Sequence, residues 1–317
     1  MTSLLGRVGT MIVRFRLAVV GLTLATLLTG CAASPDPRLD VSSTPWQRTD
    51  LWQQAADAEL LLAGVYGVAD SMQLPGCSTW CAAASAMHQA HATVLTQPNP
   101  WGGFTEPTAF VLPEYGDENA LKQDLAQDAK AALVADQAGL AAATAGPEAL
   151  LWASLVATAQ VSVAFANDQN TAVPTLSPGS VVPSQVDVGS TADAASAALD
   201  AANAVIYTAT VGAAQASTSD GLKASLAATI GQAKAEKDAL EAQINALGVT
   251  PSAPALSYPL GAGVGSDDAV QASLAPYQAN LADGYVRLAG TMTGQDAVDT
   301  AMKAGFTGTM TWWPGWG

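Results

Sequence analysis

The chain has 317 residues and carries 27 acidic against 12 basic side chains, a formal net charge of −15. A surface this acidic repels phosphate backbones and anionic lipid headgroups, so we expect no nucleic-acid partner. Alanine is abundant, and apolar residues recur at three- and four-residue spacing. This pattern predicts an all-α fold.

Residues 1–30 have the features of a signal peptide. Three arginines precede the apolar run 17–28, which is shorter than the ~20 residues that span a bilayer. Leu28-Thr29-Gly30-Cys31 then resembles the lipobox of bacterial lipoproteins, in which cleavage leaves a lipidated cysteine at the N-terminus. We therefore predict lipid on Cys31, where two acyl chains suffice for stable anchoring. An ordinary cleaved signal with an incidental Cys31 is the alternative.

Residues 31–49 are polar, contain three prolines and lack periodicity. They predict a flexible tether between the membrane and the folded part. Without the three arginines of the signal peptide, nine basic side chains face 27 acidic ones, a formal charge of −18.

Eight helices are expected after the tether, from the period of the apolar residues and the positions of proline and glycine. The apolar stretch 150–166 is interrupted by polar residues, so we interpret it as a buried helix rather than a membrane span. Pro276 is expected to kink the seventh helix or to end its first turn. The expected helices cover residues 50–73, 77–96, 118–144, 147–168, 191–217, 220–247, 267–291 and 293–303.

The eight helices divide into an N-terminal set, residues 50–169, and a C-terminal set, residues 191–317, joined by the proline-rich linker 170–190. Each set has one long loop between its second and third helices, at 97–117 and 249–265. This arrangement predicts two four-helix bundles in tandem, each with one long crossover loop. A faint similarity between the opening helices of the two sets indicates duplication.

Five segments of the second half carry a resemblance to a known family: 198–207, Lys237-Asp238-Ala239-Leu240, Ala255-Leu256-Ser257-Tyr258-Pro259-Leu260, 281–288 and the Trp-Gly ending at 312–317. On these segments, residues 191–317 resemble a ferritin-like domain family of unknown function found in actinobacterial proteins. The first half is similar to a more divergent bundle that precedes this domain in some exported members. The resemblance implies ferritin-like bundles in both halves.

Ferritin-like bundles can hold two iron ions on glutamates and Glu-x-x-His pairs. Members of the family often have Glu-His before the tyrosine of the first helix, where this chain has Ala202 and Asn203. Ala233 and Gln278 stand at two further ligand positions, and the chain contains no Glu-x-x-His. The resemblance therefore implies the fold without a di-iron site, and we expect no cofactor.

Cys77 and Cys81 are the two cysteines that remain besides Cys31. An oxidising compartment favours a disulfide between them, although Cα atoms four residues apart in a helix are about 6 Å from each other. A zinc site that combines these cysteines with His88 and His91 does not fit one helix, because Cys77 and His88 would lie about 16 Å apart.

His88 and His91, the only histidines, are three residues apart and share one face of a helix. Together with a carboxylate such as Glu59 from the neighbouring helix, they could bind a metal ion. Alternatively, they are two polar residues near a helix C-terminus, where an imidazole suits the helix dipole.

The sequence ends in an aromatic cluster that contains Trp312, Trp313 and Trp316. It could form an exposed patch that docks on a partner, or an arm folded back over the second bundle. Trp101 and Phe104 could likewise belong to an aromatic recognition loop or simply cap the first bundle.

No nucleotide-binding loop or hydrolase elbow occurs, so we expect no enzyme. The leading hypothesis is an envelope lipoprotein, anchored on the extracytoplasmic face of the cell membrane through Cys31, that serves as an interaction or scaffold module for an envelope protein. The alternative is a metal-binding or redox ferritin-like protein that uses His88, His91 and Glu59.

Overall fold

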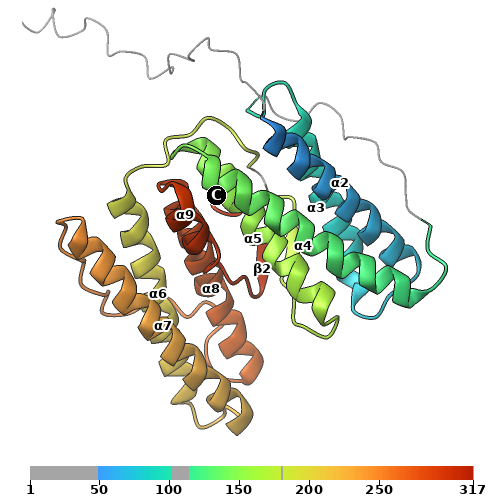
Figure 1. Ribbon diagram of the computed structural model, residues 1–317. Coiled ribbons are helices and arrows are strands. Elements are labelled where there is room, and N and C mark those ends of the chain that lie inside the picture. The colour runs from blue at the N-terminus through green and yellow to red at the C-terminus, as the bar shows by residue number, and fades with distance from the viewer. Residues whose placement is uncertain (1–48, 102–113, 180, 317) are drawn as a thin grey trace, which may run out of the picture. The chain divides into compact units, whose positions relative to one another are not determined.

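The computed structural model describes residues 49–101, 114–179 and 181–316. Within these residues it contains eight helices and two strands of three residues each (Figure 1). The fold is therefore all-α, as the sequence predicts. Two predicted sites, Cys31 and Phe104, lie outside the described residues.

The first four helices pack on one another. They are α2 (Asp50–Ser71), α3 (Cys77–Thr96), α4 (Glu118–Ala142) and α5 (Pro147–Asn167). Helix α2 contacts both α3 and α4, and α4 contacts α5. Helix α5 is long and apolar enough to cross a membrane by composition, but most of its residues are buried among the other helices. It is therefore the central core helix of this group.

The second half contains α6 (Thr191–Ala213), α7 (Asp220–Ala246), α8 (Asp267–Gly290) and the short α9 (Gly294–Ala301). Helix α6 packs against α7 and α8, and α8 also contacts α5 of the first group. The fourth expected helix has only eight residues and contacts α4 and α5 as well as α8. The two groups of helices thus meet through α5, α8 and α9.

Two short strands, which the sequence analysis did not anticipate, tie the end of the chain to the linker. Strand β1 (Thr175–Ser177) pairs in parallel with β2 (Thr309–Thr311). The Trp312 amide continues the pairing by donating to the carbonyl of Ser177 over 2.9 Å. Because β1 contacts α3, residues 309–316, called the C-terminal arm below, lie beside the first group of helices.

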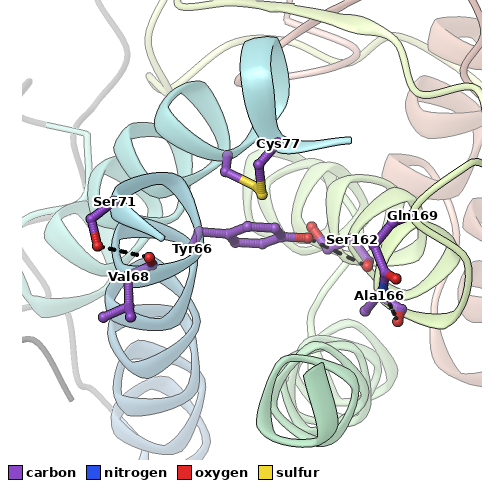
Figure 2. Close-up of a disulfide and its surroundings, with 8 residues drawn as sticks. Tyr66, Val68, Ser71, Cys77, Ser162, Ala166 and Gln169 are labelled. Atoms are coloured by element: carbon purple, nitrogen blue, oxygen red, sulfur yellow. Dashed lines mark hydrogen bonds between the residues drawn. A yellow bond between two sulfur atoms is a disulfide. The ribbon is translucent and has the colours of Figure 1, made fainter. Parts of the chain in front are cut away.

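Cys77 and Cys81 form a disulfide at the start of α3, with their Cα atoms 4.8 Å apart. Gly76 precedes them with a φ of 81°, a left-handed conformation that suits glycine. Figure 2 shows this corner and the Tyr66 hydroxyl, which donates to the carbonyl of Ser162 on α5 over 3.4 Å. The corner therefore joins α2, α3 and α5.

Glycines bring helices of each group into close contact. A Cβ atom added at Gly139 of α4 would overlap the indole of Trp152 on α5, which is buried. A Cβ atom at Gly284 of α8 would lie 3.0 Å from the Cβ atom of Ala198 on α6. Both interfaces therefore depend on the absence of a side chain.

We expect Gly139→Ala to lower the free energy of unfolding by about 1–3 kcal/mol, because the added methyl group displaces a packed tryptophan. Gly231→Ala is the matched control, since nothing lies within 4 Å of the added Cβ atom on exposed α7. It should raise the free energy of unfolding by about 0.5–1 kcal/mol, the gain in helix propensity. Urea denaturation measures the free energy of unfolding of both variants. The same change in both would contradict the packing described.

Candidate metal centre

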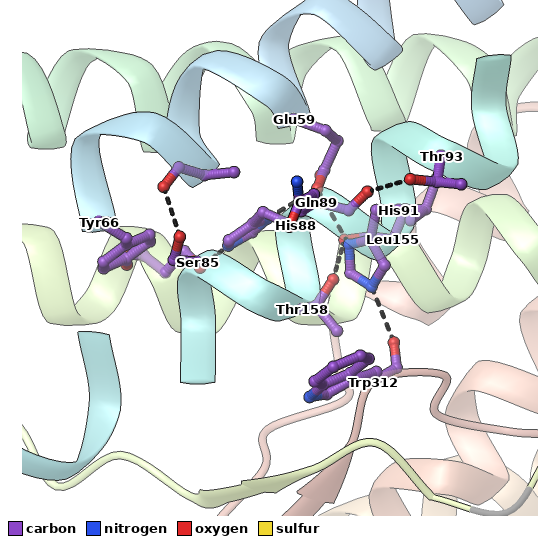
Figure 3. A network of polar contacts seen from close by, with 12 residues as sticks. Glu59, Tyr66, Ser85, His88, Gln89, His91, Thr93, Leu155, Thr158 and Trp312 are labelled. Atoms are coloured by element: carbon purple, nitrogen blue, oxygen red, sulfur yellow. Dashed lines mark hydrogen bonds and ion pairs between the residues drawn. The ribbon is translucent and has the colours of Figure 1, made fainter. Parts of the chain in front are cut away.

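Glu59 of α2 meets His88 and His91 of α3 in the interior of the first group of helices (Figure 3). All three side chains are fully buried. The Nδ1 atom of His88 lies 2.7 Å from Oε2 of Glu59, and the Nδ1 atom of His91 lies 3.0 Å from the same oxygen. Three ligand-type atoms thus lie within 4.8 Å of one another. The structure brings together the residues that the metal hypothesis named.

Helix periodicity explains this convergence. The spacing of three residues places His88 and His91 on one face of α3, and α3 packs directly on α2. Glu59 lies on the buried face of α2, between Ala55 one turn before it and Leu62 one turn after it. The core encloses both rings, so neither histidine is exposed to solvent near the end of α3.

The outer nitrogen of each imidazole is held by an oxygen. Nε2 of His91 donates to the carbonyl of Trp312 over 2.8 Å, and a carbonyl can only accept. Nε2 of His88 lies 2.8 Å from the hydroxyl of Ser162. Metal-binding histidines are typically anchored in this way, with the outer N–H on a carbonyl or another acceptor. Both inner Nδ1 atoms are therefore oriented as ligands of one ion would be.

Aromatic rings restrict both imidazoles. The ring of Tyr66 is stacked nearly parallel to that of His88, with centroids 5.6 Å apart. The indole of Trp313 lies against His91, with centroids 4.7 Å apart. Little rotational freedom remains to be lost when the histidines bind a ligand, because packing already fixes the rings.

Glu59 is ionised in this environment. Burial alone would raise its pKa, but the charges and hydrogen bonds of His88 and His91 outweigh burial and lower the pKa to about 2. Nε2 of His91 donates to the carbonyl of Trp312, and its Nδ1 lies 3.0 Å from Oε2 of Glu59. The two histidines thus stabilise the buried carboxylate, a role that a metal ion could take over.

Asp136 of α4 is a fourth member of the cluster that the sequence analysis missed. Its side chain is fully buried beside Glu59. Burial, and then the negative charge of Glu59, raise the Asp136 pKa well above its usual range. Among the described residues, its two oxygens and Oε1 of Glu59 have no hydrogen-bond partner.

One sequence signal could have revealed Asp136. The buried residues of α4 recur at helical spacing, and one charged residue interrupts this apolar stripe. The stripe consists of Leu121, Leu125, Ala129, Ala132, Asp136 and Leu140.

The tryptophans proposed for partner binding are mostly enclosed. Trp313 and Trp316 of the C-terminal arm are buried, while Trp312 and Trp101 are partly exposed. The ring centroid of Trp101 lies 6.2 Å from that of Trp316. The arm therefore reaches the first group of helices instead of covering only the second.

In the second half, the structure shows the surroundings of three residues that the sequence analysis examined as ligand positions. Ala202 and Ala233 are buried, and the amide oxygen of Gln278 accepts a hydrogen bond from Thr307. Across the described ranges, Glu59, His88 and His91 form the one group of three or more His, Cys, Asp or Glu residues close enough to share an ion.

Comparison with known proteins adds no relative. No family model matches the chain, and neither a curated protein nor a solved structure matches it. The centre must therefore be assessed on its own geometry.

Asp136→Asn should change how stability depends on pH in the metal-free protein. Because the folded-state pKa of Asp136 is raised, its contribution is fully present below the unfolded pKa near 3.8 and is lost as pH rises. We expect the variant to gain free energy of unfolding relative to the wild type between pH 4 and pH 8. Urea denaturation in the presence of a chelator measures this, and a pH-independent difference would contradict it.

Proposed function

We propose that this chain is an exported, lipid-anchored protein whose N-terminal helices bind one divalent transition-metal ion through Glu59, His88 and His91. One observation carries the proposal: two buried Nδ1 atoms and a carboxylate oxygen converge while the outer imidazole nitrogens are anchored to oxygens. Such anchoring is the usual environment of histidine ligands.

The donor set favours a restricted class of ions. Two imidazole nitrogens and a carboxylate suit Zn²⁺, Fe²⁺, Mn²⁺, Cu²⁺ or Ni²⁺. Calcium and magnesium bind through oxygen ligands, so a site with two histidines disfavours them. Iron or copper would give the redox variant of the hypothesis, and zinc a structural site.

The interaction module that the sequence favoured remains the second candidate. One observation supports it: apolar side chains are exposed around the loop between α7 and α8, where Leu256 is fully accessible and Leu247 and Val249 are each more than two-fifths exposed. Apolar residues concentrated at an exposed site are typical of contact surfaces. This candidate places binding in the second half and leaves the buried cluster a structural role.

The tandem arrangement of two ferritin-like bundles, residues 50–169 and 191–317, is also part of the proposal. It is supported by the mutual packing of α2 to α5 and by the packing of α6 against α7 and α8. The signal peptide at 1–30, the tether at 31–49 and the lipid on Cys31 rest on the sequence motifs. They support a location on the extracytoplasmic face of the cell membrane.

Metal analysis tests the centre directly. After loading with Zn²⁺ or Fe²⁺ and desalting, the wild type should retain about one equivalent by mass spectrometry, the stoichiometry of a mononuclear site. His91→Ala and Glu59→Gln each remove a ligand and should weaken binding by more than the roughly 10–100-fold that outer-shell changes cost. Glu241→Gln, which loses only a surface ion pair with Lys237, is the control. Retention of less than about a tenth of an equivalent by the wild type would refute the proposal.

Lipidation can be tested separately. Cells fed labelled palmitate should incorporate the label into the wild type and not into Cys31→Ser, because the thioether to the lipid needs the thiol. The double variant Cys77→Ser and Cys81→Ser keeps Cys31 and should be labelled like the wild type. Labelling of Cys31→Ser would show that the lipid is attached elsewhere.

A further inference from the structure

The carboxyl pair of Glu59 and Asp136 poses a charge problem that the three-ligand centre leaves unsolved. Both side chains are fully buried, and three of their four oxygens have no hydrogen-bond partner among the described residues. Buried polar groups in folded proteins are nearly always hydrogen-bonded or bound to an ion. The buried carboxyl group of Asp136 on the apolar face of α4 therefore indicates a binding partner that the protein itself does not supply.

We propose that Asp136 is the fourth ligand of the metal ion, so that α2, α3 and α4 together enclose it in a site with two imidazoles and two carboxylates. This inference rests on the proposed function.

The arrangement of the helices supports this assignment. Glu59 turns Oε2 toward the histidines, while its other oxygen, Oε1, is buried and has no hydrogen-bond partner among the described residues. Asp136 approaches from α4, which packs on α2, whereas the histidines come from α3. A tetrahedral ion needs four ligands. Helix α2 supplies one and α3 supplies two, so Asp136 of α4 would supply the fourth.

Asp136 lies outside the group of three atoms that are within 4.8 Å of one another. On metal binding its carboxylate, which has no hydrogen-bond partner among the described residues, would turn to the ion.

Charge balance favours the same ligand set. A dication held by the carboxylates of Glu59 and Asp136 and by two neutral imidazoles would leave the buried site without net charge. With Glu59 as the only carboxylate ligand, one positive charge would stay uncompensated in the core.

Four protein ligands would close the site. Structural metal sites are saturated by protein ligands, whereas catalytic sites keep a position for water or substrate. With Asp136 bound, the ion would have no open position for an exogenous ligand in tetrahedral geometry. The inference thus assigns the ion a structural or storage role.

Asp136→Asn distinguishes a ligand from a residue that only holds Glu59. An asparagine amide has nearly the shape of an aspartic acid side chain, but it lacks the anionic oxygen that binds metal. We would measure Co²⁺ absorption and Zn²⁺ affinity, by competition with a chelator, on the full mature protein in detergent. Azide added to the Co²⁺ form probes for an open coordination position.

The wild type should show the intense visible bands of four-coordinate Co²⁺, unchanged by azide. Asp136→Asn should bind Zn²⁺ at least tenfold more weakly, and its Co²⁺ bands should respond to azide. Asp128→Asn, two turns earlier on α4 and half-buried, is the matched control and should behave like the wild type. Asp136→Ala provides a second test of the same loss if the asparagine variant does not fold.

Wild-type affinity and spectrum in Asp136→Asn would overturn the fourth-ligand assignment while leaving the three-ligand centre intact. A wild-type protein that binds neither Co²⁺ nor Zn²⁺ would overturn both.

Discussion

A carboxylate without access to water requires a positive partner, and this requirement organises the first group of helices. Glu59 is held on the apolar face of α2 and finds its partners in His88 and His91, one turn apart on α3. Burial of an unpaired charge would cost several kcal/mol, so the three side chains must stay together. Their contacts reach further, because Ser162 on α5 and the carbonyl of Trp312 hold the outer nitrogens.

The C-terminal arm makes this centre depend on residues far away in the sequence. The carbonyl that orients His91 comes from a residue 221 positions later. The arm is fixed by the β1–β2 pairing and by the Gly315 amide, which donates to Asp283 of α8 over 2.9 Å. A change at the chain end is therefore transmitted to the centre through the orientation of one imidazole. The same contacts keep the two groups of helices together without a long fourth helix in the second half.

Local sequence signals were sufficient to predict the positions of the helices. The N-caps Ser190, Ser219 and Ser266 each accept a hydrogen bond from the backbone of the first turn, and the helices that follow begin within a residue of the expected positions. Interactions between distant segments were not visible in the sequence. The strands have three residues each and exist only as a pair, and the short α9 packs against helices of both groups. In the centre, the spacing on α3 predicted the pair of histidines, whereas Asp136 was missed because α4 carries many solvated charges.

The central claim is that the interior of the first group of helices is a site for one divalent metal ion. Anomalous diffraction at the zinc absorption edge, from crystals of the zinc-loaded protein, tests it most directly. The account predicts a single strong peak in this interior, about 2.0–2.2 Å from Nδ1 of His88, Nδ1 of His91 and an oxygen of Glu59. A map without a peak there, with the imidazoles still hydrogen-bonded to Glu59, would contradict it and leave the cluster as a purely structural ion pair.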